Sequence, residues 1–245
     1  MNLPACLGKI LKSLEPFVVA LSGGTDSTVL LAAAASEGID VAAVVVETDL
    51  CPAGEVAAAK KSAEALGVPC EIREVAMLEI PAVRMNTQAR CYLCKRRMMV
   101  EIESWAEAHG YAAVADGTNA DDDPEDRPGM RVLGELGVVS PFRICGMGKA
   151  EIAELAEDLG IPVAPSSSCL ATRFPPGRRI IEGEVERVRR AEALLRNAGV
   201  EGRLRVRYDG ERAVVEAERS QHALISALTE RLRELGFSVV EVKIP

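Results

Sequence analysis

The sequence has no apolar run of about 18 residues, the length at which a helix can cross a membrane. Its first residues also lack the basic segment and apolar core of a signal peptide. We therefore expect a cytoplasmic protein with no membrane partner. The composition, with 48% hydrophobic and 27% charged residues, is ordinary for a globular protein, and 245 residues are enough to bury a substantial core.

Lysine is scarce in the last third of the chain. From residue 165 onward, Lys243 is the only lysine among 15 basic residues, which face 12 acidic ones. The net charge of −8 is therefore uneven, because the first 164 residues carry 14 basic and 25 acidic residues. Arginine suits carboxylates and phosphates. So small a positive excess favours a small anionic ligand, and we expect no nucleic-acid partner.

The phosphate-binding pattern G-x-x-x-x-G-K-[ST] is also absent. The chain has instead Ser-Gly-Gly-Thr-Asp-Ser at 22–27, after an apolar segment at 17–21. An Ala/Leu-rich segment follows and ends near residue 38. This order predicts a buried strand, a tight loop and a helix that starts near Asp26.

Small and polar side chains give this loop the properties of a phosphate site. Gly23 and Gly24 permit a close approach of backbone amides to a phosphate, and the N-terminus of the following helix favours an anion. Ser22 and Ser27 add hydroxyls, and Asp26 is a candidate ligand for Mg²⁺. The loop itself offers no lysine for a terminal phosphate. The alternative is a strand-to-helix turn with no ligand.

Seven cysteines, an odd number, in a chain without a secretory signal do not indicate a disulfide framework. Cys91 and Cys94 form a Cys-x-x-Cys pair, whose spacing brings two sulfurs to one metal. Cys169 lies in a serine-rich loop and makes a third candidate ligand. The four cysteines that we expect to pack in apolar surroundings are Cys6, Cys51, Cys70 and Cys145.

Histidine is scarce as well, and this bears on the metal. A closed zinc site needs a fourth protein ligand, and the only histidines are His109 and His222. A 4Fe-4S cluster held by three cysteines leaves one iron open to an external ligand, which favours a cluster. A redox or sacrificial thiol without iron, a zinc site and inert cysteines remain alternatives.

Strands and helices alternate over residues 1–164. Besides the first strand, the pattern predicts strands at 41–47, 70–75 and 112–115, with helices between them and a last helix from Lys149 to Leu159. This arrangement predicts an α/β fold with a doubly wound parallel sheet. Gly117 lies in the polar loop that follows the fourth strand, where open α/β sheets bind their ligands, and we expect it to contact the nucleotide.

Two prolines around residue 164 mark a domain boundary, and residues 165–245 are expected to form a smaller α+β domain. Its predicted elements are a helix at 184–198, a hairpin formed by 203–208 and 213–216, a helix at 221–235 and a strand at 237–242.

The predicted hairpin carries two arginines that share a face. Arg205 and Arg207 are two residues apart on a strand, and Glu216 on the partner strand can orient one of them. Two like charges on one strand face repel each other, so an anion between them is plausible. The alternative is a pair of solvated arginines that interact with nearby glutamates.

The loop at 22–27 resembles the pyrophosphatase loop, or PP-loop, of adenylating enzymes such as GMP synthetase, NAD synthetase and tRNA thiolases, which cut ATP between its α- and β-phosphates. Over nearly its whole length the chain resembles the LarE family, sulfur transferases (sulfur insertases) of nickel-pincer nucleotide cofactor biosynthesis and lactate racemase maturation. The segments that carry this resemblance, besides the PP-loop, are Arg90–Lys95, Asp116–Asp122, Arg127–Met130, Pro165–Phe174 and Arg205–Arg207 with Glu216.

The resemblance implies a PP-loop ATPase domain of the adenine nucleotide alpha hydrolase type and a defined reaction. A carboxylate of pyridinium-3,5-biscarboxylic acid mononucleotide is adenylated by ATP, pyrophosphate is released, and sulfur replaces oxygen to give a thiocarboxylate. The residues implied to hold the ATP phosphates and Mg²⁺ are Ser22, Gly23, Gly24, Asp26 and Ser27. The residues implied to bind the substrate phosphate are Arg205, Arg207 and Glu216.

The family also suggests where the sulfur comes from. Members with only the cysteine equivalent to Cys169 give up its sulfur and become dehydroalanine, whereas others add the Cys-x-x-Cys and hold a 4Fe-4S cluster with a bound hydrosulfide. With Cys91, Cys94 and Cys169, this chain resembles the second kind, which needs a sulfide or other sulfur donor. Sacrificial transfer from Cys169 remains an alternative. The family further implies a homo-oligomer.

Two other functions remain open. A tRNA thiolase shares the PP-loop and, in some families, a three-cysteine cluster, but the net charge and the lack of an evident RNA-binding module argue against it. An adenine-nucleotide-binding module without catalysis is disfavoured by the PP-loop together with the cysteines.

Overall fold

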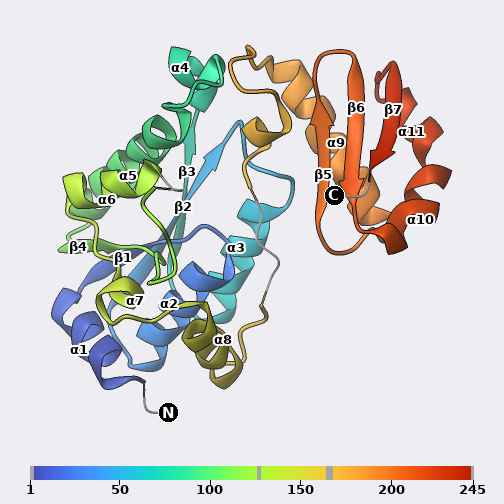
Figure 1. Ribbon diagram of the computed structural model, residues 1–245. Coiled ribbons are helices and arrows are strands. Elements are labelled where there is room, and N and C mark those ends of the chain that lie inside the picture. The colour runs from blue at the N-terminus through green and yellow to red at the C-terminus, as the bar shows by residue number, and fades with distance from the viewer. Residues whose placement is uncertain (1–2, 126–127, 164–167, 244–245) are drawn as a thin grey trace. The chain divides into compact units, whose positions relative to one another are not determined.

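The computed structural model describes residues 3–125, 128–163 and 168–243, which form two compact units, each with its own sheet (Figure 1). The first unit comprises Met1–Thr48, Gly54–Val75 and Cys91–Ser166, and the second comprises Asp49–Ala53, Ala76–Arg90 and Ser167–Pro245. The predicted boundary at 164/165 lies outside the described residues and stays a prediction.

Two short segments join the second unit although they precede residue 165 in sequence. The Asp49 carboxylate accepts hydrogen bonds from the backbone N–H groups of Met77 and Leu78, at 3.1 and 2.8 Å. The N–H of Leu170 donates to the carbonyl of Leu50 at 2.9 Å. These pairings connect residues far apart in sequence, which is why the second unit is discontinuous.

The first unit contains a parallel four-stranded sheet in the order β3-β2-β1-β4. Its strands are β1 (Phe17–Ala20), β2 (Val41–Thr48), β3 (Cys70–Val75) and β4 (Ala113–Ala115). Every residue of β1 is buried, as an apolar strand in the middle of a parallel sheet should be. Because β2 and β4 flank β1 on opposite sides, the topology reverses next to the carboxyl end of β1, where such sheets bind ligands.

Helices cover both faces of this sheet. Successive residues of β1 alternate between two cores: Val19 packs with residues of α2 and α8, whereas Val18 packs with Met99 and Ile102 of α5. The predicted doubly wound α/β fold is confirmed. The helices of this unit are α1 (Ala5–Leu14), α2 (Thr25–Ser36), α3 (Glu55–Ala65), α5 (Arg90–Ala108), η2 (Pro128–Met130), α6 (Arg131–Leu136), α7 (Pro141–Ile144) and α8 (Lys149–Asp158).

Cys6 and Cys145 form a disulfide, so the prediction that they are merely apolar packing residues is wrong, although Cys145 also packs against the core of the first unit. Cys6 lies on α1 and Cys145 directly follows α7, and the two helices are in contact within the first unit. The pairing joins residues 139 positions apart, which spacing along the chain cannot reveal. Cys51 and Cys70 are only half-buried, and burial raises the pKa of the Cys70 thiol.

The second unit contains a three-stranded sheet in the order β5-β6-β7, with an antiparallel hairpin and a parallel third strand. The α+β character expected for the C-terminal part is present. The predicted helix at 221–235 is divided at Leu228 into α10 and α11. The elements are η1 (Met77–Glu79), α4 (Pro81–Arg84), η3 (Leu170–Arg173), α9 (Glu182–Asn197), β5 (Leu204–Tyr208), β6 (Arg212–Ala217), η4 (Arg219–Gln221), α10 (His222–Ala227), α11 (Thr229–Glu234) and β7 (Val239–Lys243).

Across the three described stretches, none of the helices has both the length and the apolar character that a membrane crossing requires. Part of the Arg127–Met130 segment and of the Pro165–Phe174 segment lies outside the described residues, namely residues 127 and 165–167.

Candidate functional site

The PP-loop follows β1 directly and is held in shape by its own hydroxyl groups. The N–H of Ser22 donates to Ser27 Oγ at 3.1 Å, and the two serine hydroxyls lie 3.0 Å apart. Gly23 has a φ of +77°, and a Cβ there would lie 3.1 Å from the carbonyl oxygen of Glu55. Gly23 is therefore required by the backbone, and the loop has a fixed shape without a ligand.

Gly117 lies against the start of helix α2. A Cβ at this position would lie 2.6 Å from the backbone nitrogen of Ser27 and 2.9 Å from the carbonyl carbon of Asp26. Only a glycine permits so close an approach to the main chain. The loop after β4 is thus packed on the PP-loop, and the role of Gly117 in nucleotide binding stays a prediction.

Asp26 lies among polar groups that come from distant parts of the first unit. Its Oδ2 accepts a hydrogen bond from Asn119 Nδ2 at 2.9 Å and forms an ion pair with Lys149 Nζ. Lys149 is the first residue of α8, and its backbone N–H donates to Asp121 Oδ2 at 2.6 Å. The arrangement places a carboxylate suited to Mg²⁺ and a cation suited to phosphate at one end of the sheet.

Lys149 is not predictable from the loop, because it lies 123 positions from Asp26 along the chain. One signal was available: a cation in the first turn of a helix opposes the helix dipole and is unfavourable there. Such a residue at the start of a predicted helix needs a reason, and the carboxylate of Asp26 supplies one.

A second lysine connects the Cys-x-x-Cys helix to the same end of the sheet. Lys95 Nζ lies 3.1 Å from Oδ2 of Asp116, which is 4% exposed and directly follows β4. The same carboxylate accepts from Thr118 Oγ1 at 2.8 Å and from Ser140 Oγ at 2.7 Å. These partners compensate the buried charge of Asp116. Asp116 in turn holds Lys95, the neighbour of Cys94, in place.

Cys91 and Cys94 are three residues apart at the start of α5, so their side chains share one helix face. Cys91 is exposed, Cys94 is half-buried, and neither is in a disulfide. A Cβ on Gly129 would lie 3.3 Å from the Cys91 carbonyl oxygen, so the turn at 128–130 packs closely on these residues. Two thiols so placed fit the donor chemistry of an iron–sulfur cluster.

The third proposed ligand, Cys169, belongs to the second unit. Among the residues that the structure describes, no group of three or more His, Cys, Asp or Glu side chains is gathered as at a metal site. The three-cysteine site therefore stays a prediction. Cys169 is exposed and lies outside any disulfide, directly before η3.

Arg205 and Arg207 lie on β5, and their surroundings differ. Arg207 Nε donates to Glu216 Oε1 at 2.6 Å, and its Nη1 donates to the Thr172 carbonyl at 3.0 Å. Within the described residues the guanidinium of Arg205 donates no hydrogen bond. Burial lowers the pKa of Arg205, the charges of Arg203, Arg173 and Arg207 lower it further, and the Glu216 carboxylate opposes this in part. An anion would relieve this accumulation of positive charge.

The fold agrees with comparisons to known proteins. The family model for the queuosine biosynthesis protein QueC matches residues 16–98, which contain the PP-loop and the Cys-x-x-Cys. Uncharacterised proteins of Methanocaldococcus jannaschii and Synechocystis are each 32% identical to this chain, over 92% and 93% of it and 88% of their own lengths.

A third relative has a named activity. It is the pyridinium-3,5-bisthiocarboxylic acid mononucleotide synthase of Lactiplantibacillus plantarum, which is 30% identical over 244 residues, or 96% of this chain and 88% of the synthase. Identity at this level over nearly the whole length extends over both units. The chain therefore belongs to the LarE family.

Proposed function

We propose that the chain is an ATP-dependent sulfur transferase that converts pyridinium-3,5-biscarboxylic acid mononucleotide into a thiocarboxylate. The observation that carries this proposal is the identity to the named synthase over 96% of the chain. That synthase is named for a product with two thiocarboxylates. A carboxylate does not exchange oxygen for sulfur unless the oxygen is first made a leaving group, and the PP-loop is suited to this activation.

The activating step takes place at the PP-loop end of the first unit. A carboxylate oxygen of the substrate attacks the α-phosphorus of ATP, the bond to the bridging oxygen breaks, and pyrophosphate leaves. We propose that Ser22, Gly23, Gly24 and Ser27 hold the phosphates through backbone amides and hydroxyls, and that Asp26 holds Mg²⁺. Lys149, at the Asp26 carboxylate, then neutralises part of the pyrophosphate charge.

The phosphate of the substrate is assigned to the second unit. We propose that Arg205 and Arg207 bind it and that Glu216, which accepts a hydrogen bond from Arg207, orients that side chain. The charges of Arg203, Arg173 and Arg207 around the Arg205 guanidinium, which among the described residues only Glu216 counters, support this assignment because they favour an anion there.

We propose that Cys91, Cys94 and Cys169 hold a 4Fe-4S cluster. Such a cluster, held by three cysteines, would present a hydrosulfide as the sulfur nucleophile. This chain's own contribution is to fasten the Cys-x-x-Cys helix through the Lys95–Asp116 ion pair. That pair keeps two of the thiols at a constant place relative to the loop after β4.

The test of this function is a reaction with oxygen-free protein, ATP, Mg²⁺, sulfide and the biscarboxylic mononucleotide. We expect pyrophosphate release that depends on the mononucleotide, and a product in which sulfur has replaced oxygen, detected by mass spectrometry. Pyrophosphate release only in the presence of RNA would instead make the chain a tRNA thiolase. Nucleotide binding without pyrophosphate release would contradict any adenylating enzyme.

The sulfur source is tested separately, by measuring iron and acid-labile sulfide per chain in Cys91→Ala, Cys94→Ala and Cys169→Ala. We expect each variant to lose the cluster, and Cys94→Ala to keep measurable pyrophosphate release because it leaves the PP-loop intact. Cys70→Ala is the control. Full iron content and full sulfur transfer in Cys94→Ala would overturn the three-cysteine site. Loss of one H₂S from the mass of the chain after turnover would show sacrificial transfer from Cys169.

A further inference from the structure

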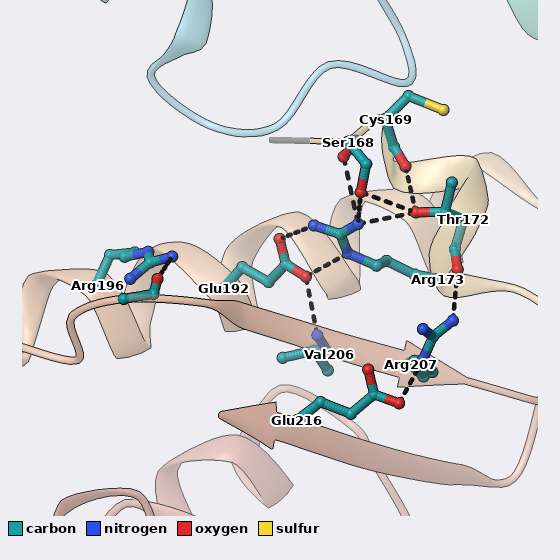
Figure 2. Close-up of polar contacts among 10 residues, drawn as sticks. Ser168, Cys169, Thr172, Arg173, Glu192, Arg196, Val206, Arg207 and Glu216 are labelled. Atoms are coloured by element: carbon teal, nitrogen blue, oxygen red, sulfur yellow. Dashed lines mark hydrogen bonds and ion pairs between the residues drawn. The ribbon is translucent and has the colours of Figure 1, made fainter. Parts of the chain in front are cut away.

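Cys169 is carried by a turn that holds its main chain and leaves its sulfur exposed. The backbone N–H and the hydroxyl of Thr172 both donate to the carbonyl of Cys169, at 3.1 and 2.8 Å. In Figure 2 the thiol points to the opposite side from this carbonyl. The turn therefore fixes the main chain from which the sulfur projects.

Arg173 is the residue that fixes it. Its guanidinium is buried, with the residue 4% exposed, and its Nη1 donates to the carbonyl and hydroxyl of Ser168, at 3.2 and 2.8 Å, and to Thr172 Oγ1 at 2.8 Å. Its Nε and Nη2 donate to the two carboxylate oxygens of Glu192 on α9, at 2.6 and 3.0 Å. One side chain thus connects the residues on both sides of Cys169 to a helix (Figure 2).

The same network continues to the strand that carries the candidate phosphate site. Glu192 Oε1 accepts a hydrogen bond from the backbone N–H of Val206 at 2.8 Å, between the two arginines of β5. From the other side, Arg207 Nη1 donates to the carbonyl of Thr172. Two separate bridges therefore tie the Cys169 turn to β5 within the second unit.

Stability alone does not explain this arrangement. The attraction within a buried ion pair offsets little more than the free energy lost when its charges leave water, and apolar side chains of similar size stabilise such a site equally well. The positive charge of Arg173 also adds to the repulsion felt by Arg205. A guanidinium that makes bonds in three directions gives something that apolar packing does not, namely one defined geometry for the turn.

We propose that Arg173, together with Glu192, is a positioning residue that sets the place of the Cys169 thiol relative to an anion held on β5. The inference rests on the proposed function, because the anion is the substrate phosphate. It acts through geometry, since Arg173 donates to Ser168 and Thr172 and not to the thiol.

The test is Arg173→Lys, which keeps the charge but cannot reach Glu192, Ser168 and Thr172 at once. We expect kcat for sulfur transfer to fall about thirtyfold, with KM for the mononucleotide within about threefold of the wild-type value, because a small misplacement of the reacting group is costly. The rate of pyrophosphate release in the first turnover, which reports the adenylation at the PP-loop, should be unchanged. Hydrogen exchange over residues 168–174 should be about tenfold faster, as expected for a loosened turn.

The matched control is Arg196→Lys on α9, the helix that carries Glu192. Arg196 also donates two hydrogen bonds to main-chain carbonyls, of Val200 and Gly202 at 2.8 and 2.7 Å, but has no bond to the turn. We expect wild-type exchange at 168–174 and wild-type kcat. Equal effects of Arg173→Lys and Arg196→Lys on kcat would overturn the proposal, as would wild-type kcat in a folded Arg173→Lys.

A second variant covers the case in which Arg173→Lys fails to fold. Thr172→Val removes, at the half-exposed surface of the turn, both an acceptor of Arg173 and the hydroxyl that donates to the Cys169 carbonyl, and the same loss of kcat at constant KM is expected. Unchanged kcat there overturns the positioning role. If the wild-type chain transfers no sulfur, the proposed function fails. In that case the hydrogen-exchange rate at 168–174 in these variants decides by itself whether Arg173 orders the turn.

Discussion

The two units hold their candidate anion sites in different ways. In the first unit the site is a stretch of main chain shaped by glycines and serines, and a single segment, 22–27, supplies nearly all of it. In the second unit it consists of guanidinium groups whose positions depend on residues from η3, α9 and two strands. Anion binding by main-chain groups should be weakened most by substitutions that add atoms next to the backbone. Anion binding by side chains should be weakened most by substitutions that remove a charge.

The largest effect is expected where an added methyl meets main chain. Gly117→Ala would place a Cβ 2.6 Å from the Ser27 nitrogen, so the loop after β4 must move off the PP-loop. We expect pyrophosphate release to fall about a hundredfold, the loss typical of displaced hydrogen-bond donors. The control is Gly134→Ala, on the exposed side of α6 with no atom near the new Cβ, which should be neutral or slightly stabilising. Equal activity of both variants would contradict the packing argument.

Removing a charge is the corresponding change in the second unit. Arg205→Ala should raise KM for the mononucleotide about twentyfold, because a hydrogen bond to a charged group contributes about 1.5–3 kcal/mol. KM for ATP should stay the same. Arg212→Ala, which removes an arginine paired with Asp209 on the same hairpin, is the control. A parallel rise in KM for ATP would mean that the two sites are not separate.

The first kind of site can be predicted from sequence, and the second only in part. Strand β1, the PP-loop and α2 follow one another, so local pattern was enough to place Ser22, Gly23 and Ser27. Arg205 and Arg207 were predicted to share a face because a strand puts alternate residues on one face, and their role as an anion site stays a prediction. Nothing local indicated that Arg173 and Glu192 are bonded, since their contact is decided by how η3 packs on α9.

The same limit explains the errors elsewhere. The Cys6–Cys145 disulfide and the contact of Lys149 with Asp26 both join distant positions, and both depend on which helices the sheet brings together. Residues 49–53 and 76–90 belong to the second unit for the same reason, because their contacts are with residues distant in the chain.

Lys149 places a side-chain charge at the main-chain site of the first unit. Removing it measures how much charge, as opposed to backbone shape, contributes to phosphate binding there. Lys149→Gln should raise KM for ATP about fivefold, less than the loss at Arg205, because the Lys149 side chain is 56% exposed and its charge is screened by solvent. Lys12→Gln, an equally exposed lysine that pairs with Glu37, should change nothing. A loss as large as that of Gly117→Ala would mean that charge, not backbone shape, dominates phosphate binding in the first unit.

Gly24 gives the smallest and most specific test, because the protein itself does not require a glycine there. Its φ of −82° is ordinary, and a Cβ would lie 3.4 Å from Ser22 Oγ, a normal contact. Gly24→Ala should therefore leave the thermal unfolding midpoint unchanged, while KM for ATP rises about threefold as the methyl meets the phosphate. Gly23→Ala, at a positive φ, should lose stability as well. If Gly24→Ala changes neither property, no ligand approaches this glycine, and the phosphates must be bound by the other amides of the loop.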